Sequence, residues 1–259
     1  MRTIIFFIAL IYPVLSVANT AEISVTKRSA DAYILTPAYA TNIGLFNTAN
    51  GVVLLDPMPG ENQLNALNSL VNSIFAKPVS YILNTHTHSD HSGGNAYFIA
   101  AGSEFIQSAA ALADFDSVTV KSHTANDAIF WHKPSNTIFV GDIYTTNWHP
   151  TFYAGGVAGF VAAVDAILNV GDEHSLIVPG HGAPSDKQQL KLFRQNTLQW
   201  VAQVKVLREQ GLTAREIKDH AEIQRILRTF NPENNADFIP PPAVARFIER
   251  TLTVIEKGI

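Results

Sequence analysis

Residues 84–95 read NTHTHSDHSGGN and directly follow an apolar run, VSYIL, at residues 79–83. The run is β-branched and aromatic enough to predict a buried strand. The paired glycines after it let the chain turn sharply, so that a helix can begin near Asn95. A strand, a polar turn and a helix in this order indicate an α/β protein with its chemistry at the turn.

The polar turn contains four potential metal ligands within six residues, namely His86, His88, Asp90 and His91. His86 and His88 are two positions apart, so in extended backbone their imidazoles point to the same side and could hold one ion. Asp90 and His91 come where the chain changes direction and could serve a second ion. Imidazole nitrogen and carboxylate oxygen suit zinc, manganese or ferrous iron. The alternative is a polar surface turn that is rich in histidine.

The motif HxHxDH followed by GGN closely resembles the signature of the metallo-β-lactamase superfamily, which includes glyoxalase II, lactonases and zinc β-lactamases. The resemblance covers nearly the whole chain after its first residues. It implies an α/β fold, a four-layer αββα sandwich with two Zn²⁺ ions at one edge between the sheets. The ligands that it implies are His86, His88 and His123 for the first ion, Asp90, His91 and His181 for the second, and Asp142 as the bridge.

Three of these ligands come from later segments of the chain. His123 is near the end of a predicted strand at residues 118–124, Asp142 follows an apolar strand at 138–140, and His181 stands in the sequence PGHG. On residue type alone, a lone strand-end histidine is a structural residue and a strand-end aspartate is a cap or turn former. The interval from His88 to His123 is shorter than is usual in the family. The resemblance therefore implies that an edge element is missing there and that one side of the site is open.

Other residues have candidate roles around this site. Asp56 ends the apolar run GVVLL and is either a turn residue or, by the resemblance, the group that orients a metal-bound histidine. Tyr144, Asn147 and His149 follow Asp142 closely and could line a substrate pocket. His149 precedes Pro150 and fits a surface turn equally well.

The first residues have the layout of a secretory signal peptide. A short basic start is followed by an apolar stretch at residues 4–15 and by the small residues Ser16 and Ala18, which predicts cleavage after Ala18. The domains are then a signal peptide at 1–18 and one hydrolase domain at 19–259, in a periplasmic or secreted protein. The apolar stretch is too short for an ordinary membrane span, so no stable membrane insertion is expected after cleavage. The alternative is an uncleaved anchor.

Composition excludes several classes of partner and mechanism. The 259-residue chain has a formal net charge of −4, which gives no support to nucleic-acid binding. It has no cysteine, so thiolate metal ligands and a cysteine nucleophile are ruled out. No Gly-x-Ser-x-Gly elbow is present either. The expected partner is a small-molecule substrate.

Hydrophobic patterning predicts the remaining elements. Short strands are expected at residues 22–27, 32–35, 42–46 and 51–55, and helices at 61–75, at 159–168 and through most of 186–256. Thr213 and Glu216 have the spacing of a capping box. His220 is expected to be an exposed helical residue.

The predicted function is that of an exported hydrolase with two zinc ions, acting on an ester, thioester, lactone or β-lactam bond. Asp90 is the predicted catalytic group, which orients the attacking water or relays its proton. Two alternatives belong to other classes. One is a sulfur dioxygenase of the same fold with a single iron ion, and the other is a non-catalytic metal-binding module.

Overall fold

The computed structural model describes residues 23–38, 41–146, 148–235 and 238–258. Its first sheet has the strand order β1-β2-β3-β4-β5-β6. The first four strands are antiparallel neighbours, whereas β5 runs parallel to β4, and β6 parallel to β5. These strands are β1 (Ile23–Lys27), β2 (Ala32–Pro37), β3 (Ile43–Thr48), β4 (Gly51–Leu55), β5 (Val79–Leu83) and β6 (Glu104–Phe105).

The second sheet has the order β10-β9-β8-β7. In this sheet β8 is antiparallel to both β7 and β9, whereas β10 is parallel to β9. These strands are β7 (Phe115–Val120), β8 (Asp127–His132), β9 (Thr137–Phe139) and β10 (Leu176–Val178). The carboxyl ends of the parallel pairs β4/β5 and β9/β10 therefore each form one edge at which loop residues can gather.

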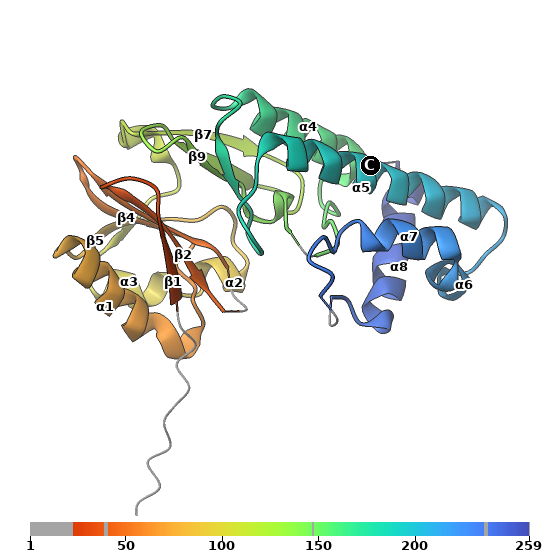
Figure 1. Cartoon of the computed structure of the whole chain (residues 1–259), viewed down its shortest axis with the longest axis horizontal. Helices are drawn as coiled ribbons and strands as arrows, with labels where there is room; N and C mark the ends of the chain where they lie inside the picture. Colours follow the sequence, from red (N-terminus) through yellow and green to blue (C-terminus); the bar gives the residue numbers. More distant parts are fainter. Residues whose placement is uncertain (1–22, 39–40, 147, 236–237, 259) are drawn as a thin grey trace, which may run out of the picture.

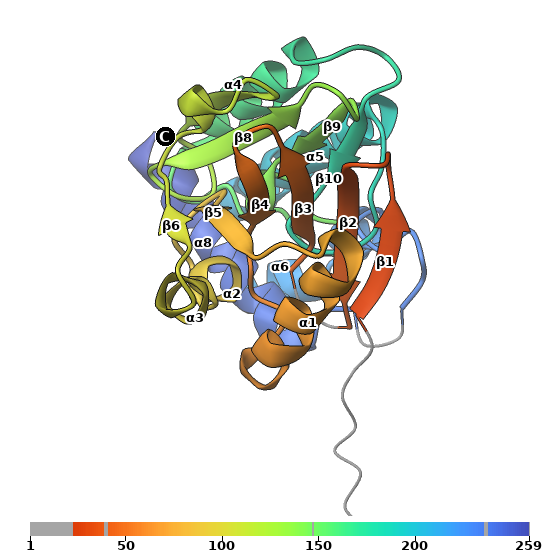
Figure 2. The ribbon, with the colours of Figure 1, turned by 90° about the vertical axis from the view of Figure 1, so that its left-hand side faces the viewer.

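Helices cover the outer face of each sheet (Figures 1 and 2). The first sheet is covered by α1 (Leu64–Phe75) and α3 (Asn95–Ala100), and the second by α4 (Gly156–Asn169) and α5 (Lys187–Glu209). The shorter elements are α2 (Ser89–Ser92), η1 (Glu61–Gln63), η2 (Ala109–Ala111) and η3 (Gly141–Ile143).

Three apolar clusters separate the four layers. Leu54 of β4 packs with Leu67 and Val71 of α1 on the outer face of the first sheet. Its neighbour Val53 points the other way and packs between the sheets with residues such as Phe139 of β9. Successive side chains of a strand alternate between its faces, so one strand contributes to two cores. The third cluster joins the second sheet to α4 and α5. The predicted four-layer αββα sandwich is confirmed.

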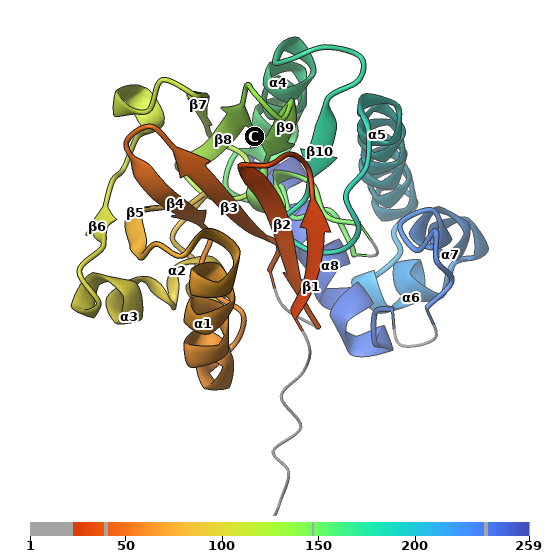
Figure 3. The ribbon, with the colours of Figure 1, turned by 60° about the vertical axis from the view of Figure 1, so that its left-hand side comes forward.

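The last three helices continue the third cluster. They lie together beside α5 (Figure 3). They are α6 (Ala214–Asp219), α7 (Ala221–Arg228) and α8 (Pro241–Lys257). Thr213 and Glu216 form the predicted capping box at the start of α6. The prediction for His220 is wrong, because this residue lies between α6 and α7, is half-buried, and accepts a hydrogen bond from the backbone N–H of Glu222.

The structure corrects two predictions near the motif. The strand predicted to end at residue 124 is β7, which ends at Val120. Beyond it, the backbone N–H groups of Ser122 and Thr124 donate to the Asp127 carboxylate, so a side chain takes the place of a strand partner and His123 lies in a loop. The second correction is α2, a helical turn that carries Asp90 and was not predicted.

In the described part of the chain, none of the helices has the length and apolar character that a bilayer crossing requires. The predicted signal peptide at residues 1–18 lies outside the described residues and stays a prediction.

Candidate metal centre

The histidine-rich turn lies at the carboxyl end of β5 and continues into α2. His88 is the N-cap of α2, and the backbone N–H of His91 donates to the carbonyl of His88 at 3.0 Å. Gly94 passes so close to the end of β4 that an added Cβ would lie 1.8 Å from the carbonyl oxygen of Pro57. A residue with a side chain cannot occupy this position without moving the turn, which explains the paired glycines of the motif.

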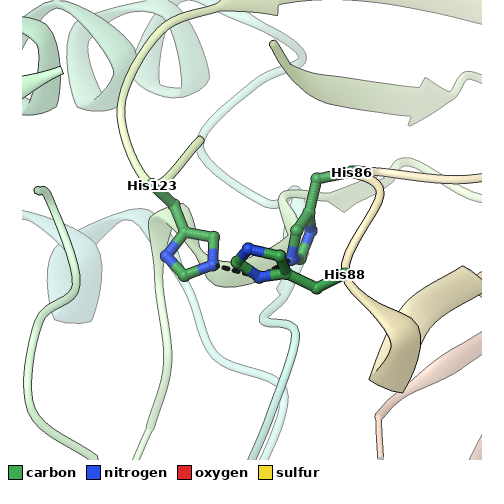
Figure 4. Close-up of side chains that lie close together, drawn as sticks. All are labelled: His86, His88 and His123. Atoms are coloured by element: carbon green, nitrogen blue, oxygen red, sulfur yellow. Dashed lines mark hydrogen bonds between the residues drawn. The ribbon is translucent and has the colours of Figure 1, made fainter. Parts of the chain in front are cut away.

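Three histidines form the first ligand cluster (Figure 4). The Nδ1 atom of His88 lies 3.1 Å from Nε2 of His86 and 3.0 Å from Nε2 of His123. The loop after β7 brings in His123, from 35 positions further along the chain. Three ring nitrogens that face one point form a suitable ligand set for a divalent cation that prefers imidazole.

The second cluster consists of Asp90, His91, Asp142 and His181. His181 Nε2 lies 3.2 Å from Oδ2 of Asp90, and His91 Nε2 lies 3.3 Å from Oδ1 of Asp142. These residues come from α2, from η3 after β9 and from the loop after β10. Nitrogen and carboxylate ligands in these proportions suit zinc, manganese or iron.

Asp142 faces both clusters with different oxygens. Its Oδ2 lies 3.6 Å from Nε2 of His123, whereas its Oδ1 lies 3.3 Å from Nε2 of His91 and 3.6 Å from Nε2 of His181. The two ligand sets are therefore adjacent, and one carboxylate can serve both. The family resemblance implies this bridging position for Asp142, and the geometry brings all seven predicted metal ligands together.

The donor set fits metal ions, because two of its buried atoms lack any other partner. His91 Nε2 and Asp142 Oδ1 are buried, and within the described residues neither has a hydrogen-bond partner. A buried polar atom without a partner costs free energy, and a cation between these two atoms would satisfy both. The implied metal pair is thus compatible with the residues present.

The pKa values show how the site is charged when no metal is bound. Burial opposes the charged form of His91, but Asp56 and Asp142 outweigh it and raise its pKa to about 10. Burial and the nearby His91 charge lower the pKa of His86 to about 3. Burial would raise the pKa of Asp142, but three neighbouring histidines hold it well below its usual range. Without a metal ion, the positive charge of protonated His91 therefore balances the negative charges of the Asp56 and Asp142 carboxylates.

Groups behind the ligands fix their outer ring nitrogens. Asp56 Oδ2 lies 2.9 Å from Nδ1 of His91, as the family resemblance implies, and Asp56 also accepts from the backbone N–H of Thr85 at 2.8 Å. Behind His123, the carbonyl oxygen and the hydroxyl of Thr151 lie 3.0 and 2.7 Å from Nδ1. The roles of Thr85 and Thr151 were not predicted from the sequence. Thr85 lies beside the motif, but nothing in the sequence connects Thr151 with His123.

The three predicted pocket residues do not line the metal centre as a group. Asn147 lies outside the described residues. Tyr144 is buried, and its hydroxyl oxygen accepts from the hydroxyl of Ser185 at 3.0 Å. His149 is 0 % exposed and stacks on Phe247 of α8 with ring centroids 4.3 Å apart. Both interpretations of His149, as a pocket residue and as a surface turn, are wrong, because aromatic side chains of the helices enclose its ring.

Comparisons with known proteins agree with this geometry. Residues 36–103, which include Asp56 and the histidine-rich turn, match the family model of the metallo-beta-lactamase superfamily. The chain is similar in structure to a metallo-beta-lactamase from Pontibacter korlensis, with a TM-score of 0.55 and 19% identity over 68% of this chain and 100% of that one. A metallo-beta-lactamase from Erythrobacter litoralis gives a TM-score of 0.58 and 16% identity over 67% of this chain and 95% of that one.

A third similar structure, a metallo-beta-lactamase from Hirschia baltica, gives a TM-score of 0.56 at 16% identity, over 67% of this chain and 96% of that one. Identities this low show the fold. Fold and ligand clusters define a protein of the metallo-β-lactamase fold with a metal-binding edge between its sheets. The family match over residues 36–103 agrees with this fold.

Proposed function

We propose that this protein is a hydrolase that uses two divalent cations, with zinc as the first choice. The observation that carries the proposal is the Asp142 carboxylate, which turns one oxygen to each ligand cluster. His86, His88 and His123 would hold one ion, and Asp90, His91 and His181 the other, with Asp142 between them. When bound, two such ions supply Lewis-acid activation of water and of a carbonyl group.

Asp90 is the residue of this chain best suited to orient the attacking water. Its side chain is 53% exposed, so substrate and water can reach it. The hydrogen bond with His181 lowers the pKa of Asp90 to about 2, which keeps the carboxylate ionised at neutral pH. An ionised carboxylate at this place can accept a hydrogen bond from the attacking water and orient it.

The proposed substrates contain an ester, thioester, lactone or β-lactam bond. In each of them a carbonyl carbon is attacked by water and a leaving group departs, which is the chemistry that such a site supports. The similar solved structures are those of metallo-beta-lactamases, which supports including β-lactams in the tests. We further propose that residues 1–18 direct export, so that the enzyme acts in a periplasm or outside the cell.

A substrate panel with and without a chelator tests the proposal. We expect hydrolysis of at least one class, its loss with chelator and its return with Zn²⁺. Asp142→Asn should lower the rate by more than the roughly 100-fold that loss of an orienting group costs. Asp116→Asn, on the exposed face of β7, is the matched control and should keep the rate. Hydrolysis that is unaffected by chelator would refute the proposal.

Metal analysis of the same preparation separates the alternatives. Two ions per chain agree with a complete second cluster, whereas a single iron with no hydrolysis would favour the dioxygenase alternative. The non-catalytic alternative depended on a displaced His123. In the structure His123 lies 3.0 Å from His88, so that reason no longer holds. Metal binding without hydrolysis of any substrate in the panel would support the non-catalytic alternative again.

A further inference from the structure

Thr151 holds the ring of His123 through two acceptor atoms. The carbonyl oxygen of Thr151 can only accept, and it lies 3.0 Å from Nδ1 of His123. The hydroxyl oxygen lies 2.7 Å from the same nitrogen and itself donates to the carbonyl of Asp142 at 3.3 Å. Both contacts therefore favour a proton on Nδ1 of His123. The lone pair is then on Nε2, the nitrogen that faces His88 and Asp142.

The residues on both sides of Thr151 are fixed in the helical core. On one side, the ring of His149 stacks on Phe247 of α8 at an interplanar angle of 11° and meets Trp200 of α5 edge-on at 4.6 Å. On the other side, Phe152 is buried and lies 5.9 Å from Phe160 of α4 between ring centroids. The segment 149–152 therefore passes from the core of the helices to the back of a metal ligand.

We propose that Thr151 is the positioning residue of His123, and that the helical core holds Thr151 in place through the stacked ring of His149. The inference rests on the proposed metal centre but concerns metal affinity, not the reaction. Outer groups of this kind fix the tautomer and the orientation of a ligand histidine. The α5 and α8 helices would then influence the first ligand cluster without contributing a ligand to it.

Zinc affinity, measured by competition with a chromophoric chelator, tests the role of Thr151. Thr151→Val keeps the shape and the carbonyl but removes the hydroxyl, and we expect about tenfold weaker binding of one ion. Thr151→Ser should restore the affinity. Thr145→Val is the matched control, because the Thr145 hydroxyl is buried and has no hydrogen-bond partner in the described residues. Equal affinities of wild type and Thr151→Val would overturn the inference.

A pair of His149 variants tests the anchor. His149→Phe keeps a stacking ring and should bind zinc like the wild type, whereas His149→Ala loses the stack and should bind more weakly. The effects of His149→Ala and Thr151→Val should be less than additive in the double variant, because His149→Ala already displaces the hydroxyl that Thr151→Val removes. Additive losses would mean that His149 does not act through Thr151. If the wild type itself binds no zinc, the proposed function is wrong. That result can be told apart from a failure of the Thr151 or His149 variants, because it appears in the wild type alone.

Solution NMR supplies a readout that a merely structural role would not move. The ¹⁵N shifts of the His123 ring report which nitrogen carries the proton. In the zinc-loaded wild type we expect the proton on Nδ1. In Thr151→Val the Nδ1 proton should exchange faster with solvent, since one of its two acceptors is gone. Unchanged shifts and unchanged exchange in Thr151→Val would contradict the assignment.

Discussion

At the scale of single residues, the candidate centre depends on groups that never face a metal. Asp56 has a positive φ of 52° at the end of β4, a conformation that few side chains tolerate. In return, its carboxylate accepts from the backbone and the hydroxyl of Thr85 and contacts the outer nitrogen of His91. One buried carboxylate thus fixes both the turn after β5 and one of its ligands.

Asp56→Asn should weaken binding of one zinc ion by roughly 10- to 100-fold while the fold is kept. Asparagine tolerates the positive φ, and its oxygen can still accept from Thr85. Its amide N–H₂, however, would face Nδ1 of His91 and favour the wrong tautomer of the ring. Zinc competition measures the loss, and Asp31→Asn, an exposed carboxylate, is the control. An unchanged affinity would show that Asp56 only shapes the turn.

At the scale of elements, strands and helices with a regular apolar pattern were predicted from the sequence. Features that depend on residues far along the chain were not. The alternation of apolar residues located β2, β3 and β4, and helical spacing located α1 and α4, because both patterns are local. The end of β7 was misplaced because the Asp127 side chain takes backbone donors that a strand would use. The burial of His149 could not be predicted, since its partners in α5 and α8 lie far along the chain.

The loop after β10 approaches the centre closely enough to make Gly180 a sensitive position. An added Cβ there would lie 2.0 Å from Oδ1 of Asp142 and 3.0 Å from Cε1 of His91. Gly180→Ala should therefore displace Asp142, with at least about tenfold weaker zinc binding and a destabilisation of about 1–3 kcal/mol.

The matched control for Gly180→Ala is Gly211→Ala. Position 211 has a φ of +90° and open space around it, so the variant adds backbone strain without a collision. Denaturation should show that both variants are destabilised, while zinc competition should show a loss only for Gly180→Ala. Similar zinc affinities of the two variants would mean that the loop after β10 can shift to accommodate the added methyl group without moving Asp142.

At the scale of the whole molecule, the candidate ligands come from both sheets, which also meet through apolar contacts and through backbone hydrogen bonds such as that from the N–H of Ala128 to the carbonyl of Thr85. His86 and His88 follow a strand of the first sheet, whereas Asp142 and His181 follow strands of the second. The family resemblance predicted that these seven side chains lie together, and the structure brings them into two adjacent clusters. The similar solved structures cover about two thirds of this chain, so the fold likeness leaves about a third without a counterpart in them.

The helical core should make stability depend on pH through His149. Burial lowers the pKa of His149 to about 3, below its ordinary value of 6.5, with Arg250 as a lesser cause. Between these two pH values the imidazole of His149 is protonated in the unfolded chain but neutral in the native state. The free energy of unfolding therefore falls as the pH drops from 6.5 towards 3, by up to about 1.4 kcal/mol per pH unit from this group.

His149→Phe should flatten this dependence, because phenylalanine keeps the ring stack and does not titrate. Urea unfolding of chelator-treated protein at several pH values between 7 and 4 measures the difference from the wild type. Phe230→Leu, in the same core, should lower stability equally at all these pH values and is the control. Parallel curves for wild type and His149→Phe would refute the role of His149.

The order of the candidate ligands along the chain has a consequence for truncated products. His86, His88 and His123 all lie in the first half of the sequence, whereas the second cluster is complete only with His181. A product that ends before residue 181 therefore keeps the three histidines of the first cluster but lacks one ligand of the second.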